Sequence, residues 1–110
     1  MDKISPELGR IITSYREELA RQGIKVTAVY LFGSYAHGTQ HDGSDIDLVI
    51  VSPDFAKLDL FERLQTLGRA AGRIWQPIEA YGVTPEEIET KSLSPFWEYI
   101  LESEAVPIAQ

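Results

Sequence analysis

A polar connection between two apolar segments constrains this chain more than any other feature. The first segment, residues 24–32, is β-branched and aromatic, and the second, residues 45–51, reads Asp-Ile-Asp-Leu-Val-Ile-Val. Both compositions are typical of strands. Residues 33–44 between them are rich in Gly, Ser, Thr, His and Asp, which predicts a loop with a short helical turn near Tyr35. The fold must therefore place this polar loop at the rim of a sheet.

The loop begins with two residues suited to holding an anion. Gly33 and Ser34 follow the first predicted strand directly. A glycine at that point lets the backbone turn sharply and come close to a ligand. The next amides can then point at an anion, with a serine hydroxyl beside them. This turn is a candidate phosphate-binding site.

Two acids, Asp45 and Asp47, stand at the start of the second predicted strand. Because side chains alternate along a strand, both carboxylates are expected on the same face, at the rim of the sheet. Like charges so close repel each other, and Mg²⁺, which binds through one or two carboxylates plus substrate phosphates, would relieve that repulsion. A phosphate cradle and a carboxylate pair in one connection favour metal-assisted phosphoryl or nucleotidyl transfer.

The alternative is that the two acids only keep a strand end soluble. The wider spacing argues against it, because six positions at about one in 15 each give a chance match of about one in ten million per register. The six positions are Gly33, Ser34, Gly38, Ser44, Asp45 and Asp47.

The pattern of Gly-Ser, ten residues and then Asp-x-Asp resembles the minimal nucleotidyltransferase (MNT) family, as do Ala-x-Gly after the serine and Ser-Asp-Ile-Asp-Leu at the strand. That family belongs to the DNA polymerase beta-like nucleotidyltransferase superfamily. The resemblance implies Mg²⁺-dependent transfer of AMP from ATP to an acceptor hydroxyl. Many members are antitoxins of a toxin-antitoxin pair, and the acceptor is often a tyrosine of a HEPN-domain toxin.

The resemblance also implies roles for single residues. Gly33 and Ser34 would hold the triphosphate, and Asp45 and Asp47 would bind two Mg²⁺ ions. A third carboxylate is expected on a later strand, where Glu79 is the candidate for metal ligand and general base. Many members have Asp there, so Glu79 departs from the pattern by one methylene. Taken alone, Glu79 has a less favoured alternative, as a surface acid of an edge strand.

Three other loop residues leave alternatives open. Ser44 either binds the nucleotide or, more simply, supports Asp45 as a turn residue. His37 stands where relatives often carry Arg, and a neutral His offers one donor where Arg grips a phosphate with two. His37 and His41 also suggest a metal site, but without a third soft ligand ordinary loop histidines are favoured.

The rest of the chain predicts helices and one further strand around this loop. Ser5-Pro6 opens a helix, and residues 58–72 read as a second amphipathic helix. Residues 75–83 predict a third strand, in which Pro77 favours an edge position or the beginning of the strand, because it lacks the donor that a central strand needs. The second helix has an apolar stripe of Leu58, Phe61, Leu64, Leu67 and Ala71.

The C-terminal part predicts two short helices and an extended end. Thr84 to Glu87 forms a capping box, and Ser94-Pro95 opens the last helix. The aromatic residues Phe96, Trp97 and Tyr99 form either core packing or a patch for a partner. Residues 105–108 either dock as an edge segment or fray. The element order indicates an α+β fold in one domain, residues 1–110: a small mixed β-sheet flanked by helices, as in the polymerase beta-like nucleotidyltransferases.

Composition excludes several classes of protein. The chain has 110 residues, a net charge of −7 and no cysteine, which excludes a disulfide scaffold and a thiolate zinc site. No basic surplus is present, so duplex nucleic acid is not an expected partner. Six acids and one Lys over residues 84–110 give −5, which suggests a solvated acidic face or a docking surface for a basic partner. No apolar run is long enough to span a membrane, and we expect a cytoplasmic protein.

Two hypotheses follow. The first is an active protein adenylyltransferase that acts as an antitoxin. The second is a catalytically weak or inactive antitoxin that neutralises the toxin by forming a complex with it. Transfer to a small molecule or an RNA end is less favoured, because 110 residues leave no room for an extra acceptor-binding domain. The same size suggests a homo- or hetero-oligomer, in which a partner or a second copy completes the acceptor site.

Overall fold

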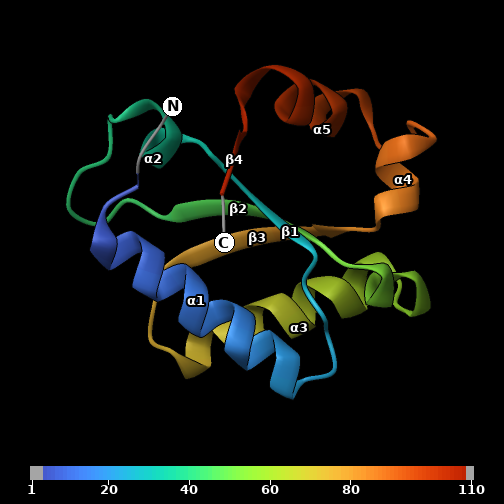
Figure 1. Ribbon diagram of the computed structural model, residues 1–110, viewed down its shortest axis with the longest axis horizontal. Helices are drawn as coiled ribbons and strands as arrows, with labels where there is room; N and C mark the ends of the chain where they lie inside the picture. The colour runs from blue at the N-terminus through green and yellow to red at the C-terminus, as the bar shows by residue number, and fades with distance from the viewer. Residues whose placement is uncertain (1–3, 109–110) are drawn as a thin grey trace.

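The computed structural model describes residues 4–108, so Met1–Lys3 and Ala109–Gln110 of the predicted domain lie outside the described residues. Its centre is a mixed four-stranded sheet in the order β3-β2-β1-β4 (Figure 1). Strand β1 is antiparallel to both β2 and β4, whereas β2 and β3 run parallel. The strands are β1 (Ala28–Phe32), β2 (Ile46–Val51), β3 (Ile78–Val83) and β4 (Val106–Pro107). The predicted α+β class, with a small mixed sheet flanked by helices, is confirmed.

Two long helices, α1 (Pro6–Arg21) and α3 (Leu60–Arg73), cover one face of the sheet (Figure 1). Helix α1 begins as predicted, with the Ser5 hydroxyl accepting from the amide of Leu8 and Pro in the first turn. Helix α3 begins with a capping box between Asp59 and Glu62. These ends satisfy amides that would otherwise lack partners. The apolar faces of both helices bury the main core against the sheet.

That core is made by alternate residues of the strands. Ile46, Leu48 and Ile50 of β2 are each buried in it with Tyr15 and Leu67 from the two helices. The Tyr15 hydroxyl donates to the carbonyl of Leu67 at 2.9 Å, and burial raises the pKa of that phenol well above its ordinary value. This hydrogen bond fixes α1 against the middle of α3.

Shorter helices lie on the opposite face (Figure 1). They are α4 (Pro85–Glu89) and α5 (Pro95–Tyr99), the last continuing as a π-helical turn over Ile100–Glu104. The remaining short helix, α2 (Ser34–His37), follows β1, and its Tyr35 and Ala36 pack against the main core. The predicted capping box of Thr84 and Glu87 is present in full. Val49, Val51 and Val83 form a second, smaller core on this face. The end of β2 that carries Asp47 extends beyond those valines.

The predicted extended end is confirmed. Residues Val106 and Pro107 pair with Leu31 and Tyr30 of β1, and the amide of Ile108 donates to the carbonyl of Val29 at 2.9 Å. Among residues 4–108, no helix is long and apolar enough to cross a membrane.

Two predicted strands start later than expected. Residues 24–27 are a crossing segment from α1 to the sheet, where the Lys25 amide donates to the Asp54 carboxylate at 2.8 Å. Strand β3 starts at Ile78, one residue after Pro77, and it is an edge strand. Trp75 adopts a positive φ of 58° and is 90% exposed. Its β propensity is overridden by the turn that brings the chain back from α3.

The predicted apolar stripe of the second helix is only partly buried. Leu67 and Ala71 belong to the core, whereas Phe61 is 67% and Leu64 is 44% exposed. The sheet ends at β3, beneath α3. The outer part of the stripe therefore has no further strand to pack on.

Candidate active site

The loop after β1 makes a tight helical turn, as predicted. Gly33 has φ 74° and ψ −154°, a conformation that residues with a side chain avoid. Helix α2 follows at once, and the amide of Ala36 donates to the Gly33 carbonyl at 3.1 Å. Gly38 ends the helix in the left-handed region, with φ 71°. Ser34 is therefore held in the first turn, half-buried beside β1.

Gly33 also lies directly against Asp47. A Cβ atom added to Gly33 would overlap carboxylate oxygen Oδ2 of Asp47. No other residue type could bring the backbone so close to this acid. The turn and the carboxylate, 14 positions apart in the sequence, thus form one site.

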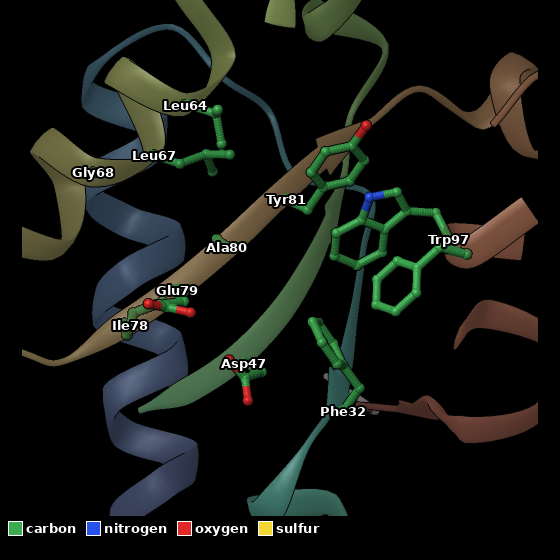
Figure 2. A pocket seen from close by; sticks show the side chains of 11 residues that line it. Phe32, Asp47, Leu64, Leu67, Gly68, Ile78, Glu79, Ala80, Tyr81 and Trp97 are labelled. Atoms are coloured by element: carbon green, nitrogen blue, oxygen red, sulfur yellow. The ribbon is translucent and has the colours of Figure 1, made fainter. Parts of the chain in front are cut away.

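Asp47 and Glu79 are register partners on the parallel strands β2 and β3. On its other side, Asp47 faces Phe32 of β1. Since partners across a sheet project from the same face, Phe32, Asp47 and Glu79 form one row across three strands, which we call the carboxylate row. Figure 2 shows the two carboxylates on neighbouring strands of that face. The predicted face of Glu79, shared with Tyr81, is confirmed.

The electrostatics of the row fit a cation. Burial raises the pKa of Asp47, and the charges of Glu79 and Asp45 raise it further. Glu79 and Asp45 are exposed, and Asp45 lies one residue before β2 begins. Asp47, whose ionised form is disfavoured by two neighbouring carboxylates, makes with them a set of hard oxygen donors suited to Mg²⁺.

The three acids do not form a preassembled metal site. Within residues 4–108, no three His, Asp or Glu side chains gather closely enough to hold a metal ion as they lie. Strand register places Asp47 beside Glu79. Asp45 lies outside the row, and its charge acts on Asp47 by raising the pKa of that acid. A cation bound at the row would relieve the repulsion that raises the pKa of Asp47.

The structure gives Ser44 a turn role. Its hydroxyl accepts from the amide of His41 at 2.9 Å, and its own amide donates to the His41 carbonyl at 2.9 Å. This turn leads directly into Asp45 and β2. Contact between Ser44 and a nucleotide stays a prediction.

The two loop histidines have separate partners. Nδ1 of His41 lies 2.8 Å from the carbonyl of Asp42, and Nε2 of His37 lies 2.7 Å from Oε1 of Glu104. The other oxygen of Glu104 accepts from the Tyr99 hydroxyl at 3.0 Å. His37 therefore ties α2 to the C-terminal segment, a link across 67 positions that no local pattern indicates.

The C-terminal aromatic residues divide between the two predicted roles. Trp97 stacks on Tyr81 with ring centroids 4.1 Å apart and meets Phe32 edge-on at 5.5 Å, so it packs on the sheet. Phe96 is 58% and Tyr99 is 55% exposed. The half-buried ring of Trp97 thus forms an aromatic wall beside the carboxylate row.

A groove of about 430 Å³ opens next to that wall. It runs between α3, β3 and α5, and both Asp47 and Glu79 line it (Figure 2). The α3 side of the groove includes Leu64 and Gly68. Sequence reasoning did not single out Gly68, although a glycine inside a predicted helix is a signal, because it costs about 1 kcal/mol relative to alanine.

Comparison with known proteins identifies the family. The model of the nucleotidyltransferase domain family matches residues 12–104. The chain belongs to this family. The match includes the turn at Gly33, the acids at 45 and 47, and Glu79.

Curated relatives resemble part of the chain. The protein adenylyltransferase MntA of Shewanella oneidensis is 42% identical over 52 residues, which cover 43% of this chain and 37% of that protein. A putative protein adenylyltransferase of Methanocaldococcus jannaschii is 36% identical over 58 residues, covering 50% of this chain and 66% of that protein. The chain thus spans less than two thirds of the length of either relative.

Solved structures share the fold over most of the chain. A crystal structure of a toxin-antitoxin with AMP-PNP superposes with a TM-score of 0.58 at 26% identity, covering 84% of this chain and 68% of that chain. A putative nucleotidyltransferase from Sulfolobus solfataricus superposes with a TM-score of 0.54 at 22% identity, covering 97% and 89%. The nucleotidyltransferase fold predicted from residues 33–48 is confirmed.

Proposed function

We propose that this chain is a Mg²⁺-dependent nucleotidyltransferase that moves AMP from ATP to a hydroxyl of a protein. Its proposed role is that of an antitoxin whose target is a tyrosine of a HEPN-domain toxin. The observation that carries the proposal is the contact of Gly33 with Asp47, which joins a candidate phosphate turn to a row of carboxylates. The names of the relatives and the nucleotide in the toxin-antitoxin structure support an adenine nucleotide as the donor, a protein as the acceptor and a toxin as the partner.

The position of each residue in the site determines its proposed role. The turn at Gly33 and Ser34 holds the triphosphate, and Ser44 keeps the loop folded into Asp45 and contacts the nucleotide. Asp45, Asp47 and Glu79 would hold two Mg²⁺ ions, which supply charge neutralisation on the phosphates and orient them. Asp47 is the central ligand, since it lies between the turn and Glu79.

The transfer itself exchanges one phosphorus–oxygen bond for another. The acceptor oxygen attacks the α-phosphorus of ATP, and the bond from that phosphorus to the bridging oxygen breaks. Pyrophosphate leaves with the bond's electron pair. The proton of the acceptor hydroxyl passes to the carboxylate of Glu79 as general base. Glu79 suits this role because it is exposed and lies on the edge strand, where an acceptor can approach.

The test is label transfer in host-cell lysate with Mg²⁺, using ATP labelled at the α- or the γ-phosphate. We expect a protein band labelled from the α position alone. Asp47→Asn and Glu79→Gln should lose the label. Glu86→Gln removes the same charge from an exposed acid of α4, away from the row, and should retain it. Label from the γ position would instead identify a kinase.

A second measurement separates catalysis from binding alone. Cells that express the partner toxin are protected by the wild-type chain under either antitoxin hypothesis. If AMP transfer is the mechanism, Asp47→Asn loses protection while Glu86→Gln keeps it. Full protection by Asp47→Asn would identify a binding-type antitoxin.

A further inference from the structure

The groove beside the carboxylate row is too apolar for the triphosphate. Asp47 and Glu79 are its charged lining residues, and most of the remaining lining is aliphatic or aromatic. A polyanion in such a space would lose its hydration and face two carboxylates. The groove therefore suits an apolar group that ends in a polar atom near the row.

The sheet order places the groove on the acceptor side. The turn at Gly33 follows β1, and β2 with Asp47 separates β1 from β3. Although Phe32 of β1 reaches one end of the groove, its remaining walls come from β2, β3, α3 and α5. A nucleotide held at the turn would thus meet Asp47 from one side, leaving the β3 side for the second substrate.

Gly68 leaves the α3 wall open. It lies in the interior of α3, where glycine costs about 1 kcal/mol relative to alanine. A Cβ atom at this position would meet no atom within 4 Å. Packing within the described chain therefore does not require a glycine here. Gly72 has similar free space, but it lies one residue from the helix end and outside the groove lining.

The free edge of β3 offers backbone groups to an incoming segment. The amides of Ile46 and Ser52 donate to the carbonyls of Pro77 and Val83. Every second residue of β3, counted from Pro77, therefore points its backbone polar groups toward β2. Ala80 belongs to the alternate residues, so its backbone N–H and C=O groups point to the outer edge of the sheet. Ala80 lines the groove. Such an edge pairs readily with an extended peptide.

Charge favours a partner that is not acidic. The chain has a net charge of −7, and the groove ends at two carboxylates. Its mouth carries the exposed apolar side chains of Leu64 and Phe96. These features fit a neutral or basic polypeptide with an apolar side chain that ends in a polar atom.

We propose that this groove receives the acceptor segment of the partner protein. An aromatic hydroxyl side chain enters between Gly68 and Trp97, and the segment's backbone pairs with β3 at Ala80. The phenol oxygen then faces the carboxylate row. This inference rests on the proposed transfer of AMP to a protein and assigns its acceptor site.

Filling the groove tests the proposal. Gly68→Phe places a ring in the groove, and Gly72→Phe places the same ring on α3 outside it. For Gly68→Phe we expect a Kd for AMP-PNP with Mg²⁺ within about twofold of wild type, but at least about tenfold less α-label on lysate protein. Gly72→Phe should match wild type in both measurements. Leu64→Lys, at an exposed position of the same wall, should also lower transfer if Gly68→Phe does not fold.

A direct probe makes the two proposals separable. N-acetyl-tyrosinamide should shift the amide NMR signals of Ala80 and Trp97 in wild type and Gly72→Phe, but not in Gly68→Phe. Undiminished transfer by a folded Gly68→Phe, or no shifts in wild type, would overturn the acceptor groove. A tenfold loss of AMP-PNP binding in Gly68→Phe would mean that the groove holds the nucleotide. Absence of α-label with wild type counts against the proposed function, and the NMR shifts then decide the groove independently.

Discussion

The backbone of Gly33 lies directly against the side chain of Asp47. A Cβ atom on residue 33 would overlap carboxylate oxygen Oδ2 of Asp47. The positive φ of Gly33 sets the direction of the turn, and the missing Cβ sets its distance from the acid. Two separate properties of glycine are therefore used at one position. The geometry of the candidate site depends on both.

Gly33→Ala should abolish the proposed activity without unfolding the protein. The added methyl displaces either the turn or the Asp47 carboxylate, and a displacement of about 1 Å can cost 100-fold in rate. We expect at least about a 100-fold loss of AMP transfer, measured with α-labelled ATP. Gly38→Ala is the control, because it has a similar φ of 71° but no atom within 4 Å of the new methyl. Equal losses in both variants would show that backbone strain alone is responsible.

Asp47→Asn should stabilise the protein when no divalent cation is present. Burial, Glu79 and Asp45 raise the pKa of Asp47 above its ordinary value of 3.8. The ionised acid is thus less favourable in the folded than in the unfolded state. That penalty is absent below the unfolded pKa and complete above the folded one. At pH 7 the variant should therefore be more stable, by about 1 kcal/mol or less because the group is partly exposed.

The measurement is thermal unfolding in EDTA at pH 3 and pH 7. The Tm of Asp47→Asn should exceed that of wild type at pH 7 and match it at pH 3. Asp42→Asn, an exposed loop acid, controls for the change in net charge. Mg²⁺ should then raise the Tm of wild type more than that of Asp47→Asn. A variant that is less stable than wild type at pH 7 would contradict the crowding of charge described for the row.

His37→Arg should tighten the binding of ATP. His37 ends α2, and its Nε2 is held by Glu104. An Arg at this position keeps a partner in Glu104 and adds donors that can grip a phosphate. We expect the KM for ATP to fall about threefold to tenfold, with a smaller change in kcat. His41→Arg adds the same charge elsewhere in the loop and should have less effect. An unchanged KM with an altered Tm would limit residue 37 to tying α2 to the C-terminal segment.

Local patterns predicted the local features of this fold. Ser5 and Thr84 begin helices because capping depends on residues within one turn. Strand alternation placed Asp47 and Glu79 on the correct faces. The pairing of these two acids was beyond such reasoning, because it depends on how far α3 carries the chain before β3 begins. The link from His37 to Glu104 has the same origin in tertiary structure.

The exposed part of α3 shows a second limit. The stripe that includes Phe61 and Leu64 has the helical period of a buried face. Periodicity reports that a helix has an apolar side, but not whether a neighbour covers all of it. Here the sheet ends at β3, so that only the inner part of the stripe is covered. The uncovered part adjoins the groove that we assign to the acceptor.

Arg63 and Glu87 should make the fold around that groove sensitive to acid. The guanidinium binds both oxygens of Glu87 at 3.0 Å and also donates to the carbonyl of Gly82 at the edge of β3. Hydrogen bonds from Arg63, the cap at Thr84 and the charge of Arg63 hold the pKa of Glu87 below its ordinary value of 4.5, against a smaller opposing effect of burial. This stabilisation is complete above the unfolded pKa and is lost as the pH falls through the folded one.

Glu87→Gln should therefore lower the stability of the protein at pH 7 by about 1 kcal/mol. The difference from wild type should begin to shrink as the pH falls below 4.5, the ordinary pKa of the group, and should be lost as the pH falls through the lower pKa of Glu87 in the folded protein. Urea unfolding at pH 7 and at pH 3 measures the free energy of unfolding of both proteins. Glu102→Gln removes an exposed partner of Lys91, with side chains 67% and 59% exposed, and should cost little at either pH. Equal losses for the two variants at pH 7 would mean that the bidentate geometry of Arg63 contributes nothing beyond an ordinary surface pair.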